Sequence, residues 1–226
     1  DEIGFIHKVY GKYLPFAILP GNNLYNSLLF HCKYLFEFAM EFVISHKTKV
    51  AQMSPDMKIT QVKSNGKSLK NIELPDVITA IRSGEQARVV NEHRGILSSS
   101  MPGDRNIHAT DIPVLLFAAR FRKKESRIEY QAYNGLVLMD VGNLADREEA
   151  VEVKRLASLA PQTVAAFVGS SGKSVKILVP FVLPDGSLPE KRELAELFHA
   201  VAYRRAVAFY QAHLQRHIEM GEEASL

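Results

Sequence analysis

The chain has 226 residues, 46% of them hydrophobic and 23% charged, which allows one large domain with a sizeable core, or one domain with an appendage. Its formal net charge of +3 is compatible with a polyanionic partner without requiring one. The single cysteine, Cys32, excludes an internal disulfide framework and a thiolate zinc site. One cysteine is typical of a reducing compartment, so we expect a cytoplasmic protein.

The first 56 residues read as an N-terminal extension whose fold the sequence leaves open. Their most hydrophobic stretch, Leu24–Ile44, is interrupted by three charged residues: Lys33, Glu37 and Glu41. Charges at these places argue against a membrane span, so we expect a helix over Leu24–Ser45 and no membrane partner. The polar segment 52–56 reads as a linker to a second domain, 57–226.

The second domain begins with short elements. A strand is expected over Met57–Val62, and the Asn-Gly pair within 64–67 predicts a turn. Leu74–Ile81 has helical spacing, with Pro75 in the first turn and Gly84 after the end. Gly, Ser, Pro and Asn are frequent in Ser98–Thr110, which predicts a loop.

Apolar runs further along predict four strands: Val114–Phe121, Leu136–Asp140, Thr163–Val168 and Val175–Val182. Asp146–Ala157 predicts a helix, with Asp146 as N-cap and Glu149 as its capping-box partner. Pro184–Gly186 reads as a turn. Apolar residues at helical period predict one long helix over Pro189–Met220. Strands and helices alternate without βαβ regularity, which predicts the α+β class.

Asp140, at the end of an apolar strand, is the first candidate site residue. An acid there ordinarily caps a turn, but it is also a potential ligand for Mg²⁺ or Mn²⁺ in nucleotidyl transfer. Such a site needs at least two carboxylates on one side of the strand, and the next position on that side is occupied by Gly142. The sequence therefore contains half of an Asp-x-Asp pair.

The segment AAFVGSSGKSVKILVPF places a Gly/Ser/Lys turn between two strands. A Walker A loop is excluded, because Phe167 stands where its first glycine is required and a strand follows the turn. The turn remains a candidate phosphate site, although a solvated hairpin turn is the interpretation that the spacing alone favours. Its predicted phosphate-binding residues are Ser171, Gly172, Lys173 and Lys176.

Basic residues lie at the end of the first of the four strands and directly after it, and four of them are predicted to bind a nucleic-acid backbone: Arg120, Arg122, Lys123 and Lys124. Arg127 extends the cluster, and the alternative is a solvated turn. His213 and His217 are spaced to share a metal on a helix, but exposed surface histidines are the preferred interpretation.

Three linked pieces resemble one family: Pro113-Val114 with Phe117 and Phe121, the GLVLMDVGNL segment and the AAFVGSSGKSVKILV segment. From about residue 57 the chain resembles the VirE N-terminal domain family of Bacteroidetes mobile-element proteins, which is related to the archaeo-eukaryotic primase superfamily. The resemblance implies a primase-like mixed sheet with flanking helices and a long C-terminal helix. Gly142 replaces the family's second acid, while Asp140 and Asn143 match. Lys176, like the family's lysine, stands where active primases carry histidine.

Three functions follow from these features. The first is a metal-dependent, primase-like nucleotidyltransferase that binds a nucleotide with Lys173 and Lys176. The second is a catalytically degenerate module that binds nucleic acid, with single-stranded DNA as the expected partner. The third is an interaction domain for a helicase-type ATPase located C-terminal to this chain. Gly142 favours the second function over the first, because one carboxylate alone holds Mg²⁺ weakly.

Overall fold

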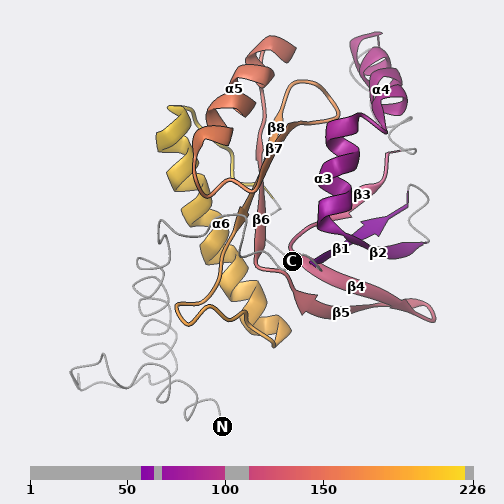
Figure 1. Cartoon of the computed structure of the whole chain (residues 1–226), viewed down its shortest axis with the longest axis vertical. Coiled ribbons are helices and arrows are strands. Elements are labelled where there is room, and N and C mark those ends of the chain that lie inside the picture. The colour runs from indigo at the N-terminus through magenta and orange to yellow at the C-terminus, as the bar shows by residue number, and fades with distance from the viewer. Residues whose placement is uncertain (1–56, 64–67, 100–111, 222–226) are drawn as a thin grey trace, which may run out of the picture. The chain divides into compact units, whose positions relative to one another are not determined.

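A computed structural model describes residues 57–63, 68–99 and 112–221, all within one compact unit (Figure 1). The predicted helix Leu24–Ser45, the linker 52–56, the turn 64–67 and most of the loop Ser98–Thr110 lie outside the described residues. The described part contains helices and antiparallel sheets in mixed order and ends in a long helix, which confirms the predicted α+β class.

The first sheet is built from β1 (Lys58–Val62), β2 (Leu69–Glu73) and β3 (Val114–Leu116). Its order is β2-β1-β3, and both pairings are antiparallel. The structure confirms the predicted strand at β1. The strand β2 was not predicted, because its sequence, LKNIE, contains only two apolar residues.

Two helices follow β2. In α3 (Leu74–Ser83) Pro75 occupies the first turn, where no intrahelical N–H bond is needed, and Gly84 closes the helix in the left-handed region at φ 71°. Both features confirm the prediction. The second helix, α4 (Ala87–Ser99), was not predicted. Two consecutive valines and the interior Gly95 weaken its helical pattern, and the sequence before it contains no strong signal for the start of a helix.

A hairpin of β4 (Ala119–Lys124) and β5 (Arg127–Tyr133) forms the second sheet. The prediction of one strand over Val114–Phe121 is wrong, because that segment is divided between two sheets. The division occurs at Phe117, whose carbonyl accepts a hydrogen bond from the side-chain amide of Asn134 instead of a strand partner. The basic residues after Phe121 continue β4, and the turn comes later, at Glu125 with φ 55°.

The third sheet has the order β6-β8-β7 and is antiparallel throughout. Its strands are β6 (Leu136–Val141), β7 (Ala165–Val168) and β8 (Val175–Pro180), so the structure confirms all three predicted strands within two residues at each end. The helix α5 (Arg147–Leu159) connects β6 to β7. Asp146 caps it by accepting a hydrogen bond from the Glu149 N–H at 2.9 Å, as predicted.

The last helix, α6 (Arg192–Leu214), is shorter than the predicted Pro189–Met220. Gln215 ends it in the left-handed region at φ 49°, and the chain then leaves the helix axis. The Ile218 N–H donates to the side-chain carbonyl of Gln211 at 3.0 Å, and Ile218 is only 1% exposed. Ile218 is therefore buried although it lies outside the helix, in the segment that returns after α6. Its position in the sequence also matched the helical period.

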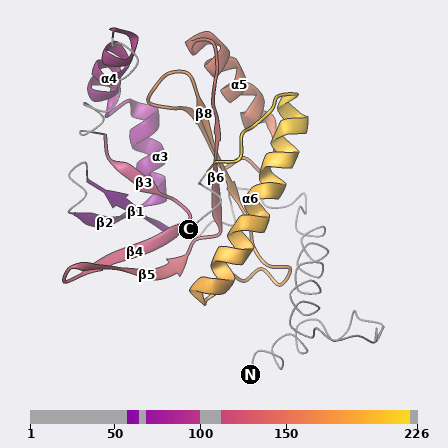
Figure 2. The same ribbon diagram turned by 180° about the vertical axis from the view of Figure 1, so that it is seen from behind.

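The third sheet separates two hydrophobic layers. One face carries Val137 and Met139 and packs against α5 and α6, which lie on the same side of the sheet (Figures 1 and 2). The opposite face carries Leu136 and Leu178, which form one cluster with Ile59 of β1, Leu74 and Val77 of α3, and Phe117, which follows β3. Alternation along β6 places Asp140 on this second face.

Candidate functional site

Asp140 and Lys176 lie opposite each other on the neighbouring strands β6 and β8. The Lys176 Nζ is 2.6 Å from the Asp140 Oδ2, and the two side chains are 27% and 32% exposed. A pair this close and partly buried is screened less than a surface pair. The antiparallel register therefore brings together two of the predicted site residues, as a salt bridge.

The second carboxylate oxygen of Asp140, Oδ1, is buried and accepts no hydrogen bond from the described part of the protein. A buried carboxylate oxygen without a donor is costly, so Lys176 is the group that compensates this acid. Within residues 57–63, 68–99 and 112–221, no three His, Cys, Asp or Glu side chains are grouped so that they could hold a metal ion. These side chains do not fit the two-carboxylate Mg²⁺ or Mn²⁺ site of a nucleotidyltransferase.

The loop between β7 and β8 is closed by its own hydrogen bonds. The Gly169 N–H donates to the Ser174 carbonyl at 2.8 Å, and the Gly172 N–H donates to the Gly169 carbonyl at 3.0 Å. The Lys173 N–H donates to the Ser171 hydroxyl at 3.2 Å. Because these three N–H groups already have acceptors, a phosphate at this loop would depend mainly on side chains. Those of Ser171 and Lys173 are exposed.

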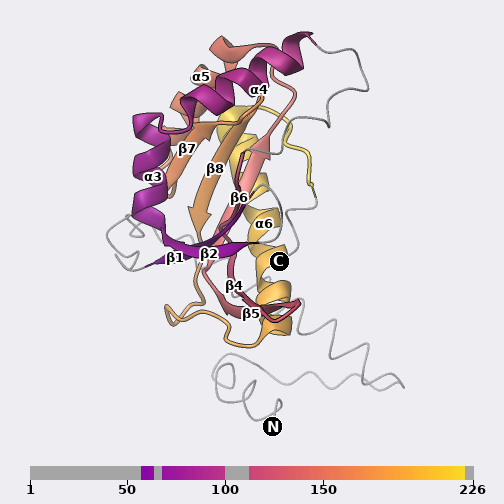
Figure 3. The same ribbon diagram turned by 90° about the vertical axis from the view of Figure 1, so that its right-hand side faces the viewer.

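The helix α4 crosses one end of the third sheet (Figure 3), and its residue Arg94 contacts this loop. Its guanidinium donates to the Ser170 carbonyl at 3.2 Å and to the Gly169 carbonyl at 3.1 Å. Burial lowers the pKa of Arg94, and the nearby charge of Arg147 lowers it further. Sequence reasoning missed Arg94, because its acceptors are backbone carbonyls about 75 residues away and leave no side-chain signal.

The segment after Asp140 is tied to the chain that follows α6. Asn143 adopts the left-handed conformation at φ 58°, and its amide donates to the Glu219 carboxylate at 3.2 Å. Glu149 accepts from the Ala145 N–H at 2.6 Å and pairs with Arg216. The hydrogen bond from Ala145 is the main cause of the lowered pKa of Glu149, and the hydrogen bond from Arg216 lowers this pKa further. The loop beside Asp140 is thus fixed by polar contacts with α5 and with the segment that follows α6.

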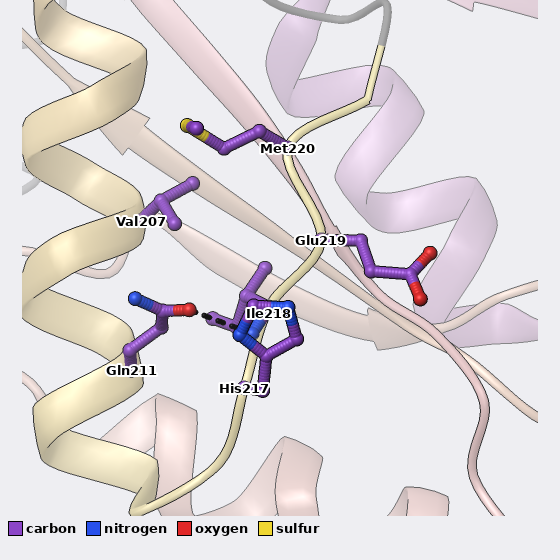
Figure 4. A pocket seen from close by; sticks show the side chains of 6 residues that line it. All are labelled: Val207, Gln211, His217, Ile218, Glu219 and Met220. Atoms are coloured by element: carbon purple, nitrogen blue, oxygen red, sulfur yellow. Dashed lines mark hydrogen bonds between the residues drawn. The ribbon is translucent and has the colours of Figure 1, made fainter.

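A pocket of about 590 Å³ lies where the chain turns back after α6 (Figure 4). It is lined by Val207, Gln211, His217, Ile218, Glu219 and Met220. His217 follows the end of α6, while His213 lies within the helix and contacts the Leu156 carbonyl at 3.0 Å. The two histidines are therefore not one helical turn apart, in agreement with their interpretation as surface residues.

The β4–β5 hairpin concentrates positive charge. Residues 119–133 contain five basic residues and two acidic ones, which gives the hairpin a formal charge of +3, equal to that of the whole chain. Arg122, Lys123, Lys124 and Arg127 are exposed, whereas Arg120 is half-buried. Glu129 offsets part of this charge, because it pairs with Arg122 at 2.8 Å and lies 3.8 Å from Lys124.

The hairpin leads into the start of β6 (Figure 1), whereas the Asp140–Lys176 pair lies near the other end of that strand. The strand starts three residues after Tyr133, at the base of the hairpin, and Asp140 lies near its other end. At about 3.4 Å per strand residue, four residues from Leu136 to Asp140 span roughly 14 Å. The predicted nucleic-acid-binding residues and the predicted phosphate-binding residues therefore do not form one site.

No helix in the described ranges is long and apolar enough to cross a membrane. No curated protein and no solved structure matches this chain. Residues 108–224 match the family model described as "BT4734-like, N-terminal domain", and this segment contains the hairpin, all of the third sheet and both of its covering helices. The match spans more than half of the chain, so the chain belongs to the family of BT4734-like N-terminal domains.

Proposed function

We propose that this chain is a nucleic-acid-binding module, which binds a single strand along the β4–β5 hairpin and carries out no nucleotidyl transfer at Asp140. The observation that carries the proposal is the concentration of charge on the hairpin, whose formal charge equals that of the whole chain. Exposed cations on one projecting element attract phosphates, because each contact releases a condensed counterion.

The resemblance to VirE N-terminal domains supports the choice of partner. It links the chain to primase-like proteins of mobile elements, for which single-stranded DNA in the cytoplasm is the expected partner. The Asp140 site supports the loss of catalysis, because the acid at the end of β6 is paired with Lys176, and Gly142 provides no second carboxylate. Membership of the BT4734-like family is compatible with this function and does not itself specify it.

The test is a titration of a labelled single-stranded oligonucleotide at about 50 and about 150 mM salt. For about four phosphate contacts, each contributing a slope of roughly −0.7, affinity should fall about 20-fold between these concentrations. Changing Lys123 and Lys124 to Ala together should leave about two contacts and reduce the loss to about five-fold.

A matched control distinguishes a loss of binding caused by changes in the hairpin from one caused by lower net charge. Arg82 on α3 and Arg204 on α6 are exposed, and changing both to Ala removes the same total charge from elsewhere. This control should retain the full salt dependence. No binding at low salt would overturn the proposal, and so would equal losses in the hairpin variant and the control.

The nucleotidyltransferase alternative has its own experiment. Primer synthesis from nucleotides with Mg²⁺ or Mn²⁺ should be absent from the wild-type chain. Robust metal-dependent synthesis would overturn the proposed loss of catalysis and leave binding by the hairpin intact. An interaction domain for a C-terminal helicase-type ATPase becomes the better proposal if the oligonucleotide does not bind.

A further inference from the structure

We infer that Lys176 replaces a divalent cation: its ammonium is a permanent, covalently attached counter-ion for Asp140. The inference rests on the proposed loss of nucleotidyl transfer, but not on binding by the hairpin. Its starting point is the 2.6 Å contact between Nζ and Oδ2, made by side chains that face each other across two paired strands.

The backbone holds Lys176 at this place. β8 is the central strand of its sheet, with β6 on one side and β7 on the other, and Lys176 is in register with Asp140 and with Phe167. A residue paired on both sides cannot move away from Asp140 without breaking the ladder. The ammonium therefore stays within reach of the carboxylate, unlike that of a lysine in a flexible loop.

The charges explain why such an ammonium excludes a metal. A divalent ion bound to Asp140 would lie within a few ångströms of Nζ, and like charges in a partly buried place repel strongly. The ion would also find one carboxylate where Mg²⁺ or Mn²⁺ sites use several oxygen ligands. Both obstacles must be removed before metal binding can appear.

Gly142 offers the place for the missing ligand. A Cβ atom added at Gly142 would meet no atom within 4 Å, so an aspartate can be introduced there without a steric clash. Gly142 lies two residues after Asp140 and one residue beyond the end of β6, so an aspartate there would be close to Asp140 in the chain. With Lys176 still present, however, this second acid would be a further partner for the ammonium, so Gly142→Asp alone should not create a metal site.

The test measures Mn²⁺ binding by electron paramagnetic resonance for the wild type and three variants: G142D, K176M and G142D/K176M. Only the double variant should bind, at least about ten-fold more tightly than the others, because it alone combines two carboxylates with no ammonium. G142D/K173M is the matched control, since Lys173 carries the same charge on an exposed side chain of the adjacent loop. It should bind no better than G142D.

Two further variants make the result decisive. Adding D140N to the double variant should abolish binding, which identifies Asp140 as a ligand. If circular dichroism shows that G142D/K176M does not fold, G142D/K176Q serves instead, because glutamine can still donate a hydrogen bond to Asp140. Mn²⁺ binding by the wild type or by G142D as tight as that of the double variant would overturn the inference, and so would no binding by a folded double variant. None of these results depends on oligonucleotide binding.

Discussion

Gly172 has a backbone conformation that residues with a side chain rarely adopt, and it lies against Arg94. Its φ is 79°, and an added Cβ would be 3.3 Å from the Arg94 Nε. Gly172→Ala should therefore lower the free energy of unfolding by about 1–2 kcal/mol, measured by urea denaturation.

Gly142→Ala is the matched substitution, because its Cβ would meet open space. It should change stability by less than about 0.5 kcal/mol. Equal losses for the two variants would show that the Arg94 contact does not constrain the loop between β7 and β8.

Single residues also show how far sequence reasoning reaches. Asp140 and Lys176 could both be placed on strands, because apolar runs marked the two strands and fixed their ends within about two residues. Their salt bridge required the register, which no sequence motif specified. Arg94 could not be predicted, because its partners are carbonyl groups, and every residue type has one.

At the scale of elements, the β4–β5 hairpin contains an acidic residue that partly neutralises its positive charge. Glu129 pairs with Arg122 and approaches Lys124, so two cations of the proposed track are partly neutralised. Glu129→Gln should make about one more contact available and tighten oligonucleotide binding about five-fold at low salt, with a steeper salt dependence.

The control for this prediction is Glu152→Gln on α5. Glu152 also pairs with an arginine, Arg155, at 2.7 Å, but lies outside the hairpin. Glu152→Gln removes the same negative charge as Glu129→Gln and should change oligonucleotide binding little. If both variants tighten binding equally, net charge rather than the hairpin would account for the affinity.

The end of α6 provides a stability test of the same kind. Ile218 lies in the segment that returns after Gln215, and its side chain is buried there. Ile218→Ala should therefore lower the free energy of unfolding by about 2–4 kcal/mol in urea denaturation. Met220 lies two residues further and is 65% exposed, and its change to Ala should cost less than about 0.5 kcal/mol. Similar small losses at both positions would contradict the packing of this segment.

The elements that were predicted wrongly share one cause. Val114–Phe121 is apolar except for Arg120, and Ile218 continues the helical period of α6, so the local pattern gave no clear reason to end either element. Each break is accompanied by a hydrogen bond between a side chain and the backbone: Asn134 with the Phe117 carbonyl, and Gln211 with the Ile218 N–H. Periodicity identifies an element well, but its end depends on hydrogen bonds that the apolar pattern does not show.

In the whole molecule, residues 57–99 contribute to the same hydrophobic cluster as the third sheet. Ile59, Leu74 and Val77 pack with Leu136 and Leu178, although the family match begins only at residue 108. The predicted α+β class followed from the alternation of elements. The separation of the hairpin from Asp140 could not be predicted, because the two are close in sequence and only the direction of β6 places them apart.

This separation gives the most direct test of the central claim, that nucleic acid binds along the β4–β5 hairpin. Hydrogen–deuterium exchange or amide chemical-shift mapping, with and without a single-stranded oligonucleotide at low salt, reports the contact surface residue by residue. We expect changes concentrated in residues 119–133 and little change at 140–143 and 169–176. Changes confined to the Asp140 and 169–176 segments, with the hairpin unaffected, would contradict the account.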